Sequence, residues 1–201
     1  MTAAVLQPLR ARLPALVILL PTLAVPAFAQ EGLLELDPAR TRIEFTLGAA
    51  LHTVHGTFRL TRGSIRFDTR TGKASGLVVV DVTSGETGSP ARDRKMHREI
   101  LESAKYPEAA FSPERVQGNL STDGPSRVEL HGVFHLHGSD HAVVLIALVQ
   151  HTGNELSASI QFVIPYVEWG LKNPSTFILR VRDRVDIDIR AAGRIDFPKS
   201  Q

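Results

Sequence analysis

Apolar and polar side chains alternate along most of the chain after residue 30. Clear examples are the stretches 42–47, with sequence RIEFTL, and 185–190, with sequence VDIDIR. A period of two is typical of antiparallel strands that are buried on one face, and turn-forming pairs such as Asp123-Gly124 and Gly153-Asn154 separate the stretches. The pattern therefore predicts an all-β fold of roughly eight strands. The candidate strands cover 33–37, 41–48, 54–68 with a bend near Gly63, 75–83, 108–117, 126–137, 141–151, 154–164 and 184–195.

One stretch, 90–103, has a helical pattern instead. Pro90 follows Ser89 as an N1 proline follows an N-cap, and Met96 and Ile100 then recur at helical spacing. Tyr106-Pro107 ends the pattern. We expect one short helix between two groups of strands.

A long antiparallel meander must remove its exposed sheet edges, and closure into a barrel does so. A barrel of about eight strands has enough interior space for one small or chain-like ligand. A sandwich of two sheets with a filled core fits the same period, so the pattern leaves both architectures open.

The first 29 residues have the composition of a secretory signal peptide. Arg10 and Arg12 precede an apolar run over 13–25, and Ala27-Phe28-Ala29 forms an A-x-A cleavage site. The run contains two prolines and is short for a membrane span, so no transmembrane anchor is expected after cleavage. We predict cleavage after Ala29, one domain over 30–201, and a periplasmic or secreted location.

Charge and cysteine content restrict the partners. The chain has 23 basic and 21 acidic residues; without Arg10 and Arg12 the balance is 21 against 21. A balanced domain gives no electrostatic reason to expect nucleic acid as a partner. The chain has no cysteine, so it can form no disulfide.

Several short sequences appear in the order found in the YceI-like family. These are HTVHGTF at 52–58, GSIRFD at 63–68, SGE at 84–86, RDRKMH at 92–97, KYP at 105–107 before Phe111, GVFHLHG at 132–138 with HAV at 141–143, and a closing strand over 183–193. They cover nearly the whole domain, and we identify the chain as resembling that family.

The resemblance implies an exported, lipocalin-like antiparallel barrel that holds a polyisoprenoid chain, such as a quinone tail, or another amphiphile. It implies binding, for transport or storage, and neither catalysis nor a required cofactor. The expected partner is a hydrophobic small molecule, with a homodimer as an open alternative for the assembly. The stretch PYVEWGLKNP at 165–174 stands where many members have an Arg-Ser-Asp-Phe-Gly-like sequence, and it predicts a different loop.

A tunnel for such a tail needs large apolar side chains that face inward, because each buried CH₂ of the ligand contributes only about 0.8 kcal/mol. Each large apolar residue is on its own more often an ordinary core residue than a ligand contact. The candidate ligand-binding residues are Phe45, Phe58, Phe67, Val78, Val80, Phe111, Phe134, Leu136, Leu145, Phe162, Ile164, Trp169 and Phe177.

Histidines provide a competing hypothesis. His131, His135 and His137 recur at even spacing, and His141 follows the next turn, so several imidazoles could face one metal ion. The opposite parity holds Phe134 and Leu136, which indicates that the histidine face is the solvated one. A histidine-face metal-binding protein is therefore the alternative function, and no metal site is assigned.

Sequence features of enzymes are weak. The chain has no G-x-S-x-G or H-E-x-x-H motif and no cysteine nucleophile. Ser139, Asp140 and His141 are neighbours in a turn, but nothing there predicts an oxyanion hole. An esterase-like enzyme is the third hypothesis, behind lipid binding and metal binding.

Overall fold

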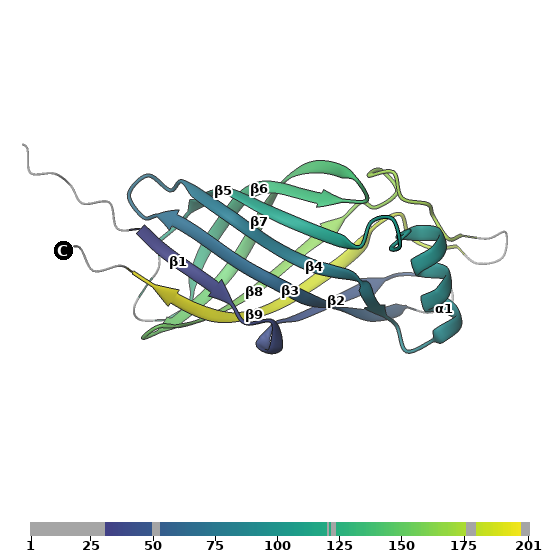
Figure 1. The fold of residues 1–201 in the computed structure, drawn as a ribbon, viewed down its shortest axis with the longest axis horizontal. Coiled ribbons are helices and arrows are strands. Elements are labelled where there is room, and N and C mark those ends of the chain that lie inside the picture. The colour runs from purple at the N-terminus through teal and green to yellow at the C-terminus, as the bar shows by residue number, and fades with distance from the viewer. Residues whose placement is uncertain (1–30, 50–52, 120, 122–123, 176–179, 198–201) are drawn as a thin grey trace, which may run out of the picture.

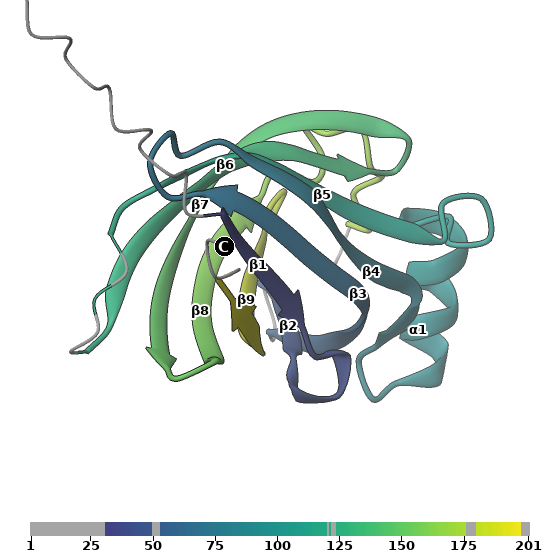
Figure 2. The ribbon, with the colours of Figure 1, turned by 60° about the vertical axis from the view of Figure 1, so that its left-hand side comes forward.

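The computed structural model describes residues 31–49, 53–119, 121, 124–175 and 180–197. Within these ranges nine antiparallel strands form one sheet (Figures 1 and 2). The predicted signal peptide lies outside them. The strands are β1 (Glu31–Leu36), β2 (Arg42–Leu47), β3 (Val54–Asp68), β4 (Ala74–Glu86), β5 (Glu108–Gln117), β6 (Ser126–Leu136), β7 (Ser139–Thr152), β8 (Glu155–Ile164) and β9 (Val185–Asp196).

The sheet closes into a barrel. Its order is β1-β3-β2-β9-β8-β7-β6-β5-β4, and a further pairing between β3 and β4 joins the two ends. The β3–β4 ladder shifts register between Thr57 and Arg59 and again between Leu60 and Arg62. Such bulges bend a strand and increase its twist, close to the bend expected near Gly63. The barrel is therefore confirmed, and the sandwich alternative is wrong.

Nine strands occupy eight positions around the barrel because β1 and β2 share one. Both pair with β3 on one side and β9 on the other: β1 meets the end of β3, as in Glu31 opposite Asp68, and β2 meets its beginning. Between them lies a 3₁₀ turn, η1 (Pro38–Arg40), where the Asp37 carboxylate accepts a hydrogen bond from the Ala39 amide at 2.9 Å. The prediction of roughly eight strands thus matches the barrel positions.

The predicted helix over 90–103 is shorter than expected and changes type. An α-helix, α1 (Pro90–Lys95), continues as one π-helical segment, η2 (Met96–Ile100). Pro90 occupies the first turn as predicted, but the Ser89 side chain makes no capping hydrogen bond. Figure 1 shows α1 at one end of the barrel, opposite the end where β1 begins. No helix in the described part of the chain is long and apolar enough to cross a membrane.

Alternation places one face of each strand inside the barrel. Along β6 the side chains of Val128, Leu130, Phe134 and Leu136 face the interior cavities. Gly132 lies on the same face, where a Cβ atom would stand 2.2 Å from the Ser112 carbonyl oxygen. A side chain at this position would therefore force the β5–β6 ladder apart.

Candidate ligand-binding cavity

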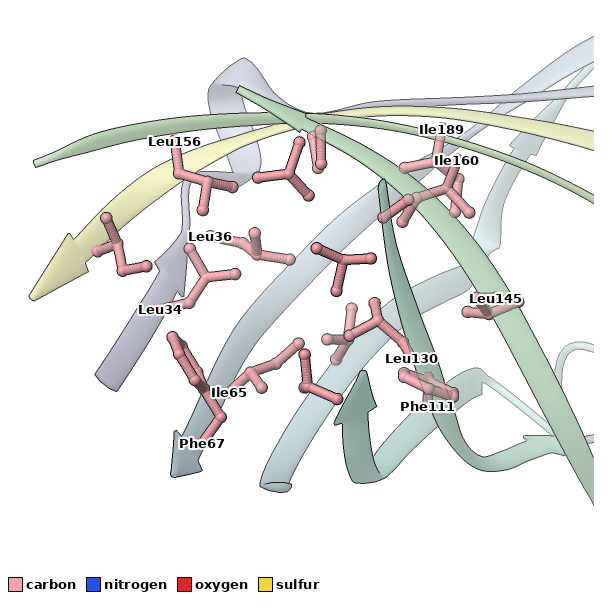
Figure 3. Close-up of a pocket in the computed structure, with 18 of the residues that line it drawn as sticks. Leu34, Leu36, Ile65, Phe67, Phe111, Leu130, Leu145, Leu156, Ile160 and Ile189 are labelled. Atoms are coloured by element: carbon pink, nitrogen blue, oxygen red, sulfur yellow. The ribbon is translucent and has the colours of Figure 1, made fainter. Parts of the chain in front are cut away.

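The interior holds a chamber of 480 Å³ at the end of the barrel where β1 begins (Figure 3). Inward side chains of many strands meet there, and those labelled in Figure 3 are all apolar. The polar side chains among its described lining are Thr41, Asp68, Thr69 and Asn119. The lowered pKa of Asp68, caused by hydrogen bonds from the Thr71 and Arg70 amides, favours a carboxylate at this end.

A second chamber, of 300 Å³, lies under the helix. Met96 and Ile100 of η2 line it, as do Tyr166 and Leu171 from the connection between β8 and β9. Tyr166 and Leu171 are buried, at 6% and 4% exposure. The unusual 165–174 segment therefore supplies part of the wall of this chamber.

Tyr166 brings a hydroxyl group to this wall, and that hydroxyl has a hydrogen-bond partner within the protein. The hydroxyl donates a hydrogen bond to the Arg182 carbonyl oxygen at 2.6 Å. Burial, with a smaller contribution from the charge of Asp183, raises the pKa of Tyr166 to about 12. The side chain is therefore neutral at ordinary pH and adds no charge to the chamber.

The two chambers meet at a shared wall. Five apolar residues line both of them, namely Ile43, Val80, Phe134, Phe162 and Ile189. Phe134 and Phe162 lie edge to face there, with ring centroids 6.2 Å apart. Because no polar residue stands at the junction, an apolar chain could pass from one chamber to the other by displacing side chains only.

Eleven of the thirteen predicted ligand-binding residues line these chambers. They are Phe45, Phe58, Phe67, Val78, Val80, Phe111, Phe134, Leu136, Leu145, Phe162 and Ile164. Trp169 is not part of either lining: its ring stacks on His141 with centroids 3.9 Å apart. Phe177 lies outside the described residues. Whether the eleven contact a ligand stays a prediction.

The sequence prediction missed aliphatic residues on the same faces. Ile187 and Ile189 share the parity of β9 that points inward, and both line a chamber. Strand parity alone would have identified them, because inward residues of one strand recur every second position. Parity gives no such help for Arg92 and Lys95 of α1, which also line the second chamber.

The four histidines of the metal-binding hypothesis do not converge. His131 and His135 lie on the face of β6 that points away from the chambers. Among the described residues, no group of three histidine, aspartate or glutamate side chains could hold a metal ion. Each histidine meets a different neighbour: Glu129 lies 3.6 Å from His131, Asp140 2.7 Å from His135, Glu102 2.8 Å from His137, and Trp169 stacks on His141.

Comparison with known proteins identifies the family. A family model described as a YceI-like domain matches residues 34–192. The chain belongs to the YceI-like family. A search of curated proteins found no match.

Three solved structures share the YceI-like fold at low sequence identity. BcnA of Burkholderia cenocepacia has 16% identity and a TM-score of 0.64, with 78% of this chain and 98% of that chain covered. A polyisoprenoid binding domain of Saccharophagus degradans, implicated in plant cell wall breakdown, has 18% identity and a TM-score of 0.59, with 85% of this chain and 100% of that chain covered. The YceI protein of Campylobacter jejuni has 17% identity and a TM-score of 0.58, covering 75% and 88%.

Proposed function

We propose that this protein holds a polyisoprenoid or similar amphiphilic lipid, such as one with a quinone tail, non-covalently inside the barrel. The observation that carries the proposal is the pair of apolar chambers, 480 and 300 Å³, with five shared wall residues. Ligand pockets for small molecules occupy roughly 300–1,000 Å³. A long tail gains affinity by summing about 0.8 kcal/mol for each CH₂ that it buries, and most residues that line the two chambers are apolar.

Structural similarity supports the same function. The Saccharophagus degradans domain that shares this fold is a polyisoprenoid binding domain. At 18% identity, that structure shows only that the two proteins share a fold. We therefore propose the same class of ligand for this chain. The absence of a sequence motif for catalysis agrees with a binding role that requires no cofactor.

We also propose that the protein works outside the cytoplasm, in the periplasm or after secretion, as a lipid carrier or store. The predicted signal peptide over 1–29 supports this location. A long isoprenoid tail is poorly soluble in water, so moving it between membranes requires a protein that covers it.

Native mass spectrometry tests the proposal. The protein is purified from an expression host without added lipid, measured intact, and measured again after denaturation. A bound amphiphile should appear as a discrete excess mass that denaturation releases, and organic extraction should identify its class. Protein that is empty and also fails to bind added geranylgeraniol would contradict the proposal, as would a metal adduct in place of lipid.

A further inference from the structure

The chamber under the helix has a one-sided charge. Apart from Thr87 and Tyr166, its polar lining among the described residues consists of Arg92 and Lys95, both from α1, and no acidic side chain lines it. The opposite chamber has the reverse sign, because its charged lining residue is Asp68. The charged side chains that line the two chambers therefore differ in sign.

Both cations are free of ion pairs within the described chain. The acidic residues of the same segment are engaged elsewhere: Asp93 accepts hydrogen bonds from the Thr87 amide, at 2.9 Å, and from the Thr87 hydroxyl, and Glu99 pairs with Arg98 at 2.7 Å.

Arg92 is held in place rather than left to move in solvent. Its Nε atom donates to the Thr87 hydroxyl at 2.8 Å, and its Nη2 atom donates to the Thr87 carbonyl oxygen at 3.0 Å. These bonds fix the guanidinium plane and leave Nη1 for a ligand. Arginine is suited to anionic oxygens because its planar fork matches carboxylate and phosphate geometry.

An apolar chamber lined by two cations that form no ion pair within the described chain fits one chemical class. We propose that the amphiphile carries an anionic oxygen headgroup, phosphate or carboxylate, which contacts Arg92 and Lys95, while its tail runs toward the Asp68 end. This inference rests on the proposed lipid-binding function and adds the headgroup and the orientation. The reverse orientation would place the anion beside the Asp68 carboxylate, where like charges repel.

The other basic residues of the helical segment separate this proposal from a general surface charge. Arg94, Lys95 and Arg98 are all exposed, but of these three residues Lys95 alone lines a chamber. A purely electrostatic surface effect would depend on them as strongly as on Lys95. A headgroup site should depend on Lys95 and be insensitive to Arg94, which makes Arg94→Gln the matched control for Lys95→Gln.

The experiment uses three probes with the same tail, namely geranylgeranyl phosphate, geranylgeranic acid and geranylgeraniol. Affinities are measured by calorimetry on delipidated protein. We expect the phosphate to bind about tenfold more tightly than the alcohol, with the acid between them. Lys95→Gln should weaken phosphate binding by about two- to fivefold, the range typical of a partly exposed ion pair, and leave alcohol binding unchanged.

Arg94→Gln should leave all three affinities unchanged. The double variant Arg92→Gln with Lys95→Gln should remove the preference for the phosphate, and added salt should reduce that preference in the wild type. Equal affinities for phosphate and alcohol, or an equal loss in Arg94→Gln and Lys95→Gln, would overturn the headgroup site and leave the lipid-binding function standing. If no probe binds, the lipid-binding function itself fails.

Discussion

Glu102 and His137 contact one another at the end of the barrel where the helix lies, with Oε2 and Nε2 2.8 Å apart. They are also the two non-glycine residues with positive φ in the described chain, at 45° and 52°. The first follows η2, and the second begins the turn between β6 and β7. The Tyr106 ring adds a contact to His137, with centroids 4.3 Å apart. Two backbone turns in unfavourable conformations are thus joined by their side chains, and this fastens the helical segment to the barrel wall.

Glu102→Ala should lower the free energy of unfolding by about 0.5–1 kcal/mol, because it removes the contact and keeps the unfavourable φ. Glu102→Gly removes the same contact but relieves the backbone, so it should be less destabilising than the alanine variant. Urea unfolding of both variants measures the order. If Glu102→Gly had a lower free energy of unfolding than Glu102→Ala, the unfavourable φ at this position would not contribute to the loss of stability.

Phe134→Glu should abolish lipid retention, because Phe134 lines both chambers and a carboxylate at their junction would need water that the apolar walls do not provide. Val144→Glu is the matched control, since Val144 is 52% exposed on the outer face of β7. Native mass spectrometry reads the bound mass, and circular dichroism checks that each variant is folded. A folded Phe134→Glu protein with the wild-type lipid mass would remove this residue from the site.

Ala147→Phe should shorten the tail that the barrel accepts. Ala147 is 2% exposed and lines the 480 Å³ chamber, so a ring there would occupy ligand space. The affinity for geranylgeraniol should fall more than that for farnesol, by about tenfold for the loss of 1.4 kcal/mol of tail burial. Ala142→Phe, on the exposed face of the same strand, should change neither affinity. Equal losses for both tails would place the ligand elsewhere.

The strands could be predicted from the sequence because their information is local. The stretch 185–190 alternates so regularly that a shift of one residue would turn Ile187 and Ile189 outward, and the observed β9 keeps both inside. The same parity correctly separated Phe134 and Leu136, which face the chambers, from His131 and His135.

Closure of the barrel, and the placement of Arg92 and Lys95 at the second chamber, depend on contacts between distant parts of the chain. The register shifts that join β3 to β4, and the shared position of β1 and β2, are properties of the whole sheet that a period of two does not encode. Trp169 is a large aromatic residue, as a tunnel lining needs, but it lies in the connection after β8. The inward and outward alternation of a strand cannot be used to orient its side chain there. Arg92 and Lys95 look like part of a solvated charge run until the barrel places them over a chamber.

Tyr166 gives the protein a pH dependence in the alkaline range. Its folded pKa of about 12 is raised above the ordinary value of 10, chiefly by burial, so the folded state holds this proton more tightly than the unfolded state. The associated stability is fully present below pH 10 and is lost as pH rises from about 10 toward 12. Tyr166→Phe should remove this loss, and it should also cost about 0.5–1.5 kcal/mol at pH 8 for the hydrogen bond to the Arg182 carbonyl.

The measurement is the free energy of unfolding in urea for wild type and Tyr166→Phe between pH 8 and 12. We expect wild type to be the more stable protein at pH 8, and the two curves to converge and then cross as pH rises, since the wild type alone has this phenol to ionise. Tyr106→Phe removes the chain's other tyrosine hydroxyl and should retain the wild-type loss of stability. A constant gap between wild type and Tyr166→Phe across this range would show that the buried phenol does not set the alkaline limit, and the loss would then belong to other groups.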